Sequence, residues 1–459
     1  MAAFSGKFKY LEAGGALLQE GACRLAFAEE SLTLTPAKGA PLVCDLADVD
    51  VFVPGDYELS LKLYTGKTIL LSHFAKVFQN LCHDLLEAWR TRLIQCLLLE
   101  DLEEIARYDG QAQLDSTQGA FSSRAEIRLY KSNLAVVPES GNGFSWRLAD
   151  IDSLDFAEAT YTIDLRSGDD RLILTRLAKR TREFIDKLQE AMADISEKSA
   201  ATLHDVLPFL NPDQLQRTAE LMKEGRAAPV SSLSAIHPKT ERALVENAVD
   251  ESLRPYFDAL KAQTSGHGYF AGFKFVRPEP EAEELEASDA ESTAGQAPAE
   301  EQDSVSQEDA DVAGEVEDGE EQGDPVLHWF FFPLKVPGAS TPANVVAWEA
   351  SSRSGRATYF FHLLPPAQAS RLEDKGQAAE AIAESIRQLN RAIVLLNFRR
   401  EPIYLPDDSL DAQPRFHRYA IAKRKLPALR QLRASFLGRA IHTSTTAWQK
   451  QVQAIISKA

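Results

Sequence analysis

Cysteine is scarce in this sequence, with four residues in 459 and none of them in a CxxC pair or at the spacing of a metal site. A disulfide framework in a chain of this length would need more, so we expect reduced, buried thiols and a cytoplasmic protein. Long apolar runs are also lacking. No stretch approaches the roughly 20 apolar residues that cross a bilayer, and we expect no signal peptide, because the N-terminus lacks an apolar core.

Catalytic and cofactor-binding motifs are missing as well. The nine histidines form no HxH, HxxxH or HExxH pair, and there is no GxSxG sequence and no phosphate-binding loop. We therefore predict that the protein is not an enzyme and that it uses no cofactor and no metal. The enzymatic alternative would need an unrecognised site in the C-terminal part of the chain, in a deep pocket lined by His328, His362 or Glu349.

Charge is distributed unevenly along the chain. There are 68 acidic and 50 basic residues, which give a formal net charge of -18. The acidic tract, residues 278–324, holds 19 Asp and Glu and no Lys or Arg, whereas the basic tail, residues 412–459, holds 10 Lys and Arg and no acid. The acidic tract has too few large apolar groups to offset the entropy of ordering, so we expect it to be disordered.

The strongest pattern is an internal repeat. A shift of 102 residues places residues 23–66 on residues 125–168 without a gap, and nine of the 44 positions are identical. Chance would give about three identities, so we interpret the two stretches as copies of one module. The repeat includes Leu-Ala-Asp-Val-Asp at 46–50 and Leu-Ala-Asp-Ile-Asp at 148–152. In both copies we expect the two aspartates to cap nearby backbone amides at the end of a strand.

In each copy the spacing of the apolar residues changes once, from every second position to every third or fourth. Leu59, Leu61 and Leu63 alternate with polar residues, as a strand with one buried face does, and turn residues separate several such segments in both copies. Apolar residues then recur every three or four positions over 74–89 and 177–192, which predicts one amphipathic helix at the end of each copy.

About six short antiparallel strands closed by a single C-terminal helix resemble the pleckstrin-homology-like (PH-like) superfold, in which the helix plugs one open corner of a bent barrel. The resemblance covers residues 8–97 and 110–198 and implies an α+β fold. Many PH-like domains hold phosphoinositides with Lys and Arg between the first two strands. Here that loop carries Glu29 and Glu30 in the first copy and Lys131 alone in the second. We therefore expect a protein-binding surface and no membrane partner.

The rest of the chain predicts a third unit. Helical patterns cover most of 199–265, and a strand, the acidic tract, three further strands and a helix follow. The predicted order is PH-like domain 1 (8–97), PH-like domain 2 (110–198), a helical connector (199–265), an α+β domain (266–411) with a disordered acidic insertion at 278–324, and a basic helical tail (412–459).

The basic tail is the candidate binding segment. Its cations could contact the phosphates of a nucleic acid, lie on an anionic membrane, or dock on acidic surfaces of the same chain. The acidic tract could compete for them. The candidate anion or nucleic-acid contacts are Arg415, Arg418, Lys423, Arg424, Lys425, Arg430, Arg433 and Arg439.

We predict a non-enzymatic protein-interaction or scaffold protein that uses its tandem PH-like surfaces to bind an unidentified protein partner. The first alternative is a nucleic-acid-binding or histone-chaperone-like protein that uses the basic tail and the acidic tract, since tandem PH-like domains with an acidic stretch are similar in outline to FACT-type histone chaperones. The sequence predicts no particular oligomeric state.

Overall fold

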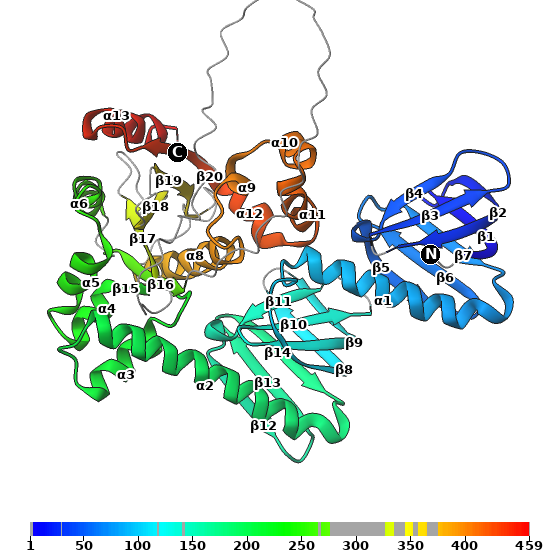
Figure 1. The fold of residues 1–459 in the computed structure, drawn as a ribbon, viewed down its shortest axis with the longest axis horizontal. Helices are drawn as coiled ribbons and strands as arrows, with labels where there is room; N and C mark the ends of the chain where they lie inside the picture. The colour runs from blue at the N-terminus through cyan, green and yellow to red at the C-terminus, as the bar shows by residue number, and fades with distance from the viewer. Residues whose placement is uncertain are drawn as a thin grey trace, which may run out of the picture.

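The computed structural model is an α+β structure in which three β-sheets follow one another along the chain (Figure 1). It describes residues 3–28, 30–116, 119–139, 143–264, 268–275, 326–334, 345–351, 357–364 and 375–458. The expected disorder of the acidic tract therefore concerns residues outside this description. None of the helices in the described ranges is both long and apolar enough to pass through a membrane.

The first module, residues 3–96, is a curled antiparallel sheet closed by a helix (Figure 1). Its seven strands lie in the order β4-β3-β2-β1-β7-β6-β5. Helix α1 buries Leu81, Leu85 and Trp89 against the sheet, because these residues recur at helical spacing. The elements are β1 (Ala3–Leu11), β2 (Leu17–Phe27), β3 (Ser31–Pro36), β4 (Leu42–Asp45), η1 (Leu46–Asp48), β5 (Val49–Pro54), β6 (Glu58–Leu63), β7 (Thr68–Ser72), η2 (Ala75–Val77) and α1 (Phe78–Cys96).

The second module, residues 104–206, repeats this arrangement with strand order β11-β10-β9-β8-β14-β13-β12. The bounds of β3, β4 and η1 and those of β10, β11 and η3 differ by 102 residues, the shift found in the sequence. The two modules are consistent with tandem PH-like domains. The elements are β8 (Glu104–Ser116), β9 (Gly119–Tyr130), β10 (Asn133–Pro138), β11 (Phe144–Arg147), η3 (Leu148–Asp150), β12 (Ser153–Ala157), β13 (Thr162–Ser167), β14 (Asp170–Thr175), η4 (Ala178–Arg180) and α2 (Thr181–Val206).

Each sheet has seven strands where the sequence predicted about six, and both begin earlier than expected. Strand β1 starts at Ala3 and β8 at Glu104, ahead of the predicted boundaries at 8 and 110. The reason is that these strands bury little. Phe8 is the one fully buried residue among the described side chains of β1, so apolar alternation is weak there.

The C-terminal unit, residues 207–458, is a six-stranded antiparallel sheet with helices on both faces. Strand β17 is buried on both sides: the Trp329 Nε1–H donates to Asn390 Oδ1 of α8 at 3.0 Å, whereas Phe330 and Phe332 contact Phe257 of α6. The strands are β15 (Ala228–Pro229), β16 (Phe270–Phe275), β17 (Val326–Leu334), β18 (Val345–Ser351), β19 (Ala357–His362) and β20 (Phe436–Ile441). The helices are α3 (Pro212–Leu221), α4 (Val230–Ile236), α5 (Thr240–Ala248), α6 (Arg254–Gln263), α8 (Lys375–Leu395), α9 (Glu401–Tyr404), α10 (Asp407–Ala412), η6 (Pro414–Phe416), α11 (His417–Lys425), α12 (Pro427–Ser435) and α13 (Thr445–Ile456).

The basic tail is neither separate nor wholly helical, which corrects the prediction of a helical tail. Residues 436–441 form β20, an outer strand of the third sheet, and Trp448 of α13 is fully buried in the same core as α5 and α6. The predicted connector, residues 199–265, shares that core and so belongs to the C-terminal unit. The prediction of a helix over residues 436–441 was wrong because it used helix propensity alone. Pairing with β19 decides the conformation of these residues.

Candidate functional site

The repeated acidic loop of the first module, residues 46–50, is a docking point for the basic tail. Arg424 Nη1 lies 2.8 Å from Asp48 Oδ1, and Lys425 Nζ lies 2.5 Å from Asp50 Oδ1. Lys425 is 0% exposed and also donates to the Val49 carbonyl at 3.0 Å. A buried ammonium group needs such partners, because leaving it unpaired would cost several kcal/mol.

The equivalent loop of the second module, residues 148–152, meets the C-terminal unit in the same way. Arg391 Nε lies 3.5 Å from Asp150 Oδ2, and Asp152 contacts Arg226 at 3.1 Å and Arg387 at 3.6 Å. Burial favours a raised pKa for Asp152, but a hydrogen bond from the Gly168 N–H and the two arginines outweigh it and lower the pKa. The two copies thus use equivalent loops to hold one C-terminal unit.

The expectation that these aspartates cap nearby backbone amides is wrong. In the first module it is Asp45 that accepts from the Ala47 N–H, at 2.8 Å. In the second, Asp152 accepts from Gly168, which lies 16 residues away in the sequence. The Lys and Arg side chains that pair with these aspartates come from distant parts of the chain. Sequence patterns over a few residues could not have predicted them.

Two more candidate cations of α11 and one of α12 also have acidic partners within the chain. Arg418 lies 2.9 Å from Asp101 and 3.5 Å from Glu100, in the segment between the two modules. Lys423 and Arg433 both contact Asp407, at 2.7 and 2.9 Å, and the Lys423 hydrogen bond is the main cause of the lowered pKa of Asp407. The tail is therefore held by acids of its own chain.

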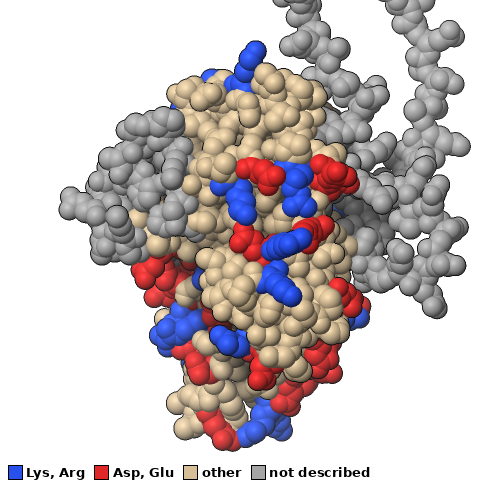
Figure 2. Space-filling view, turned by 90° about the vertical axis from the view of Figure 1, so that its left-hand side faces the viewer, with Lys and Arg blue, Asp and Glu red and all other residues tan. Residues whose placement is uncertain are grey.

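Three further arginines contact carbonyl oxygens or aromatic rings. Arg430 donates to the carbonyls of Lys423 and Arg424 at the end of α11. Arg415 lies over the ring of Phe416 and Arg439 over that of Tyr404. Figure 2 shows acidic and basic side chains interspersed over one face of the molecule, without a broad patch of one sign. Nucleic-acid contact by the eight candidate cations stays a prediction.

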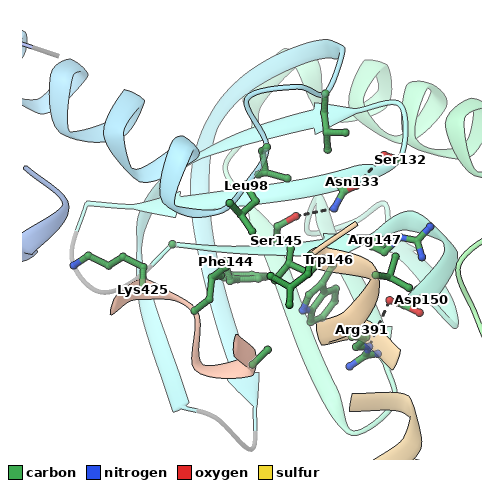
Figure 3. A pocket seen from close by; sticks show the side chains of 18 of the residues that line it. Leu98, Ser132, Asn133, Phe144, Ser145, Trp146, Arg147, Asp150, Arg391 and Lys425 are labelled. Carbon is green, nitrogen blue, oxygen red and sulfur yellow. Dashed lines mark hydrogen bonds and ion pairs between the residues drawn. The ribbon is translucent and has the colours of Figure 1, made fainter. Parts of the chain in front are cut away.

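A cavity of about 1160 Å³ lies where the second module meets the C-terminal unit (Figure 3). Most of its lining comes from the segment between the modules, from β9 to β11, from the C-terminal end of α8, and from α11 with the start of α12; Glu224 and Lys274 also contribute. Leu98, Phe144, Trp146 and Leu426 provide apolar surface, and Arg391 adds a charge. The volume is large enough for a short peptide segment.

Strand β11 presents its open edge at this cavity. It is an outer strand that pairs with β10 on one side only, and all four of its residues line the cavity. The Leu148 N–H donates to the Ser132 carbonyl at 2.9 Å, and hydrogen-bonded and non-bonded positions alternate along an antiparallel pair. The backbone N–H and C=O groups of Ser145 and Arg147 therefore point away from β10, along the free edge.

Three aromatic rings form a row beside this edge. The ring centroid of Phe144 lies 5.9 Å from that of Phe121 and 5.8 Å from that of Trp146. All three side chains are half-buried and line the cavity. Next to them the Asn133 side-chain amide donates to Ser145 Oγ at 3.0 Å (Figure 3). An edge strand beside apolar rings is the arrangement that captures an extended peptide.

The residues of the enzymatic alternative lie elsewhere. His328, His362 and Glu349 are on β17, β19 and β18, and none of them lines the 1160 Å³ cavity. Strand register places His362 opposite Val345, four residues along β18 from Glu349. Burial lowers the pKa of His328 to about 4 and lowers that of His362, so both rings are neutral at neutral pH. Glu349 accepts a hydrogen bond from Thr358 in the buried sheet.

The thiols are poorly suited to nucleophilic chemistry. Burial, with the charges of Asp48 and Asp45, raises the pKa of Cys44 to about 12, and burial raises that of Cys96 to about 12. Such thiols stay protonated, whereas the thiolate is the nucleophile. Within the described ranges, no three His, Cys, Asp or Glu side chains are grouped so as to hold a metal ion.

The aromatic row was missed by reasoning from the sequence, although one signal was present. The shift of 102 residues places Phe144 and Trp146 on Leu42 and Cys44. Two large rings thus replace smaller side chains on one strand of the second copy. That substitution between copies could have marked β11 as different, but only the tertiary structure shows that it faces a cavity.

Comparison with known proteins gives a weak likeness among solved structures. No family model matches the chain, and no curated protein matches it. Among solved structures, one similar chain belongs to a structure described as the Spt16D Pob3N heterodimer, with 19% sequence identity and a TM-score of 0.16. The match covers 36% of this chain and 83% of that chain. It assigns neither a family nor a function to this protein.

Proposed function

We propose that this protein is a non-enzymatic interaction protein, built from two PH-like modules clamped on a C-terminal α+β unit. Its partner is an extended segment of another protein, which binds in the cavity as an added strand on β11. The observation that carries the proposal is the free edge of β11 beside the row of Phe121, Phe144 and Trp146. Main-chain hydrogen bonds would supply affinity and the rings would select side chains.

The chemistry of the lining supports binding rather than catalysis. Among the described residues that line the cavity there is no histidine and no cysteine. Its carboxylates already have partners: Asp150 pairs with Arg391, and Glu224 pairs with Arg147 at 3.1 Å. The cavity therefore offers hydrogen-bond donors, rings and an open strand edge, which are the features of a recognition site.

The test is a selection of 12-residue peptides displayed on phage, with the full chain immobilised. Peptides that bind would then be measured against Ser145→Pro, which removes an edge N–H of β11. The matched control is Val43→Pro at the equivalent position of β4, an outer strand of the first module. We expect Ser145→Pro to weaken binding at least about tenfold and Val43→Pro to leave it unchanged.

Hydrogen exchange gives a second readout on the same complexes. A bound peptide should slow amide exchange in residues 143–147 of the unmodified chain, because the outward N–H groups would gain acceptors. Selected peptides that bind both proline variants as tightly as the unmodified chain, with no protection at β11, would overturn the proposal.

A further inference from the structure

The cavity lining carries an excess of positive charge. The described lining residues include seven Lys and Arg but only four Asp and Glu. The acids are Asp101, Asp150, Asp170 and Glu224. A segment that enters the cavity alongside the aromatic row would therefore be favoured if it carried carboxylates, since low-dielectric surroundings strengthen the attraction.

Three guanidinium nitrogens at the cavity are buried without a hydrogen-bond acceptor: Arg147 Nη1, Arg391 Nε and Arg418 Nε. The last two lie 3.5 Å from Asp150 and Glu100, which is an ion-pair distance rather than a hydrogen bond. Buried N–H groups that lack an acceptor cost free energy, so these arginines would gain by turning toward a carboxylate in the cavity, the strongest acceptor that a peptide can bring.

The acidic tract begins beside this cavity. Lys274 lines the cavity and is the penultimate residue of β16, and Phe275 pairs with Val326 of β17 across the residues between them. Both ends of the intervening chain, residues 276–325, thus start from one point next to the lining. Because the chain is attached beside the lining, tethering sets an effective concentration of the tract on the order of millimolar.

These observations deepen the proposed function and depend on it: we infer that the acidic tract, residues 278–324, is the resident ligand of the β11 cavity and competes in cis with partner segments. The tract supplies 19 carboxylates and no cation. Its target is this cavity, to which the basic tail contributes Arg415, Arg418 and Lys425. The tail cations Lys423 and Arg424 lie outside the lining and pair with Asp407 and Asp48. A partner must displace the tract to bind.

The test compares the full chain with a neutral-tract variant, in which the 19 acids become Asn and Gln at unchanged length. The probe is a fluorescent peptide that copies residues 279–291, and its binding is followed by anisotropy. We expect the peptide to bind the neutral-tract variant at least about tenfold more tightly than the full chain, because competition in cis is removed. We also expect slower amide exchange at residues 143–147 in the full chain than in the variant.

Two further variants distinguish a failure of this inference from a failure of the proposed function. In the neutral-tract background, Trp146→Ala should abolish peptide binding, whereas Tyr64→Ala, which removes an exposed ring of the first module, should not. Equal affinity for the full chain and the neutral-tract variant, with the Trp146 dependence intact, would overturn occupancy in cis but leave the proposed function standing. Peptide binding that is absent or independent of Trp146 would overturn the acidic ligand, and the Ser145→Pro comparison would then decide the proposed function by itself.

Discussion

The two modules are alike in strand order and differ in how they meet the C-terminal unit. The core of the first module continues into that unit: Ala47 and Cys96 pack with Ile421 of α11. The second module keeps a barrel core of its own, and its acidic loop meets the unit through ion pairs, while Leu203 near the end of α2 packs in the core of the unit. A dry contact leaves no room for a ligand, whereas a contact made of separate ion pairs leaves the space that becomes the cavity.

The same difference appears between β4 and β11, the fourth strands of the two modules in chain order and outer strands of their sheets. In β4, Val43 is 63% exposed and Cys44 is buried, so the strand shows solvent a single apolar side chain. In β11, at the equivalent positions, Ser145 and Trp146 are half-buried and line the cavity. One copy of the module is thus used for attachment, and the other combines attachment with an outer strand that lines a cavity.

The largest expected effect is a difference in the free energy of unfolding between substitutions in the two acidic loops, residues 46–50 and 148–152. Asp50→Asn should lower the free energy of unfolding by about 3 kcal/mol, because the buried Lys425 would lose its charged partner. Asp152→Asn should cost about 1 kcal/mol, since Asp152 and both of its arginines are partly exposed. Urea denaturation followed by tryptophan fluorescence measures both, with Asp56→Asn on an exposed turn as the control. Equal losses in the two loops would contradict the comparison.

A second pair of positions tests how closely the first strand of each module lies against the chain that leads from the last strand into the helix. A Cβ on Gly110 would meet the Thr175 carbonyl oxygen at 2.9 Å, and one on Gly6 would meet the ring of Phe74 at 2.6 Å. The backbone cannot yield as a ring can, so we expect Gly110→Ala to cost about 2 kcal/mol and Gly6→Ala about 1 kcal/mol. Thermal denaturation of the two variants gives the order, and a reversed order would show that the Phe74 ring is the more rigid neighbour.

Matched substitutions in β4 and β11 should show whether a loss of stability and a loss of peptide binding can be told apart. Cys44→Ala removes a buried sulfur and should cost about 1 kcal/mol without affecting peptide binding. Trp146→Ala, at the equivalent position, should cost about 1–2 kcal/mol, because its ring packs against the core of the module, and should abolish peptide binding, because the ring lines the cavity. Denaturation and anisotropy on the same samples measure the two effects. A large loss of stability in Trp146→Ala would mean that the ring is structural.

Acidification should weaken the second loop by a small amount. The lowered pKa of Asp152 means that its stabilisation is fully present above the unfolded value of about 4 and is lost as the pH falls through the folded value. The advantage of the unmodified chain over Asp152→Asn should therefore shrink below about pH 4. Burial outweighs Arg424 and raises the pKa of Asp48, so protonation of that residue shifts stability in the opposite direction. Denaturation midpoints at pH 7, 5, 4 and 3 test this, and a constant advantage would contradict it.

Much of the fold could be predicted because it depends on short-range patterns. Alternation in Leu59, Leu61 and Leu63 and the helical spacing of Leu81 and Leu85 correspond to β6 and α1 as found. Strand β20 was missed, because six residues among helix formers carry no local signal for pairing with β19. The cavity could not be predicted at all, since its lining joins segments that are spread from residue 98 to residue 428.

The sequence by itself determined the duplication, the α+β class, and the charge segregation into an acidic tract and a basic tail, because these follow from residue order and composition. Only the tertiary structure decided where the charges go: Lys425 into a buried pair with Asp50, and Arg391 toward Asp150 at the edge of a cavity. The reason is physical. Burial of an ion pair and exposure of a strand edge depend on packing between distant elements, and each is set by the whole chain rather than by any stretch of it.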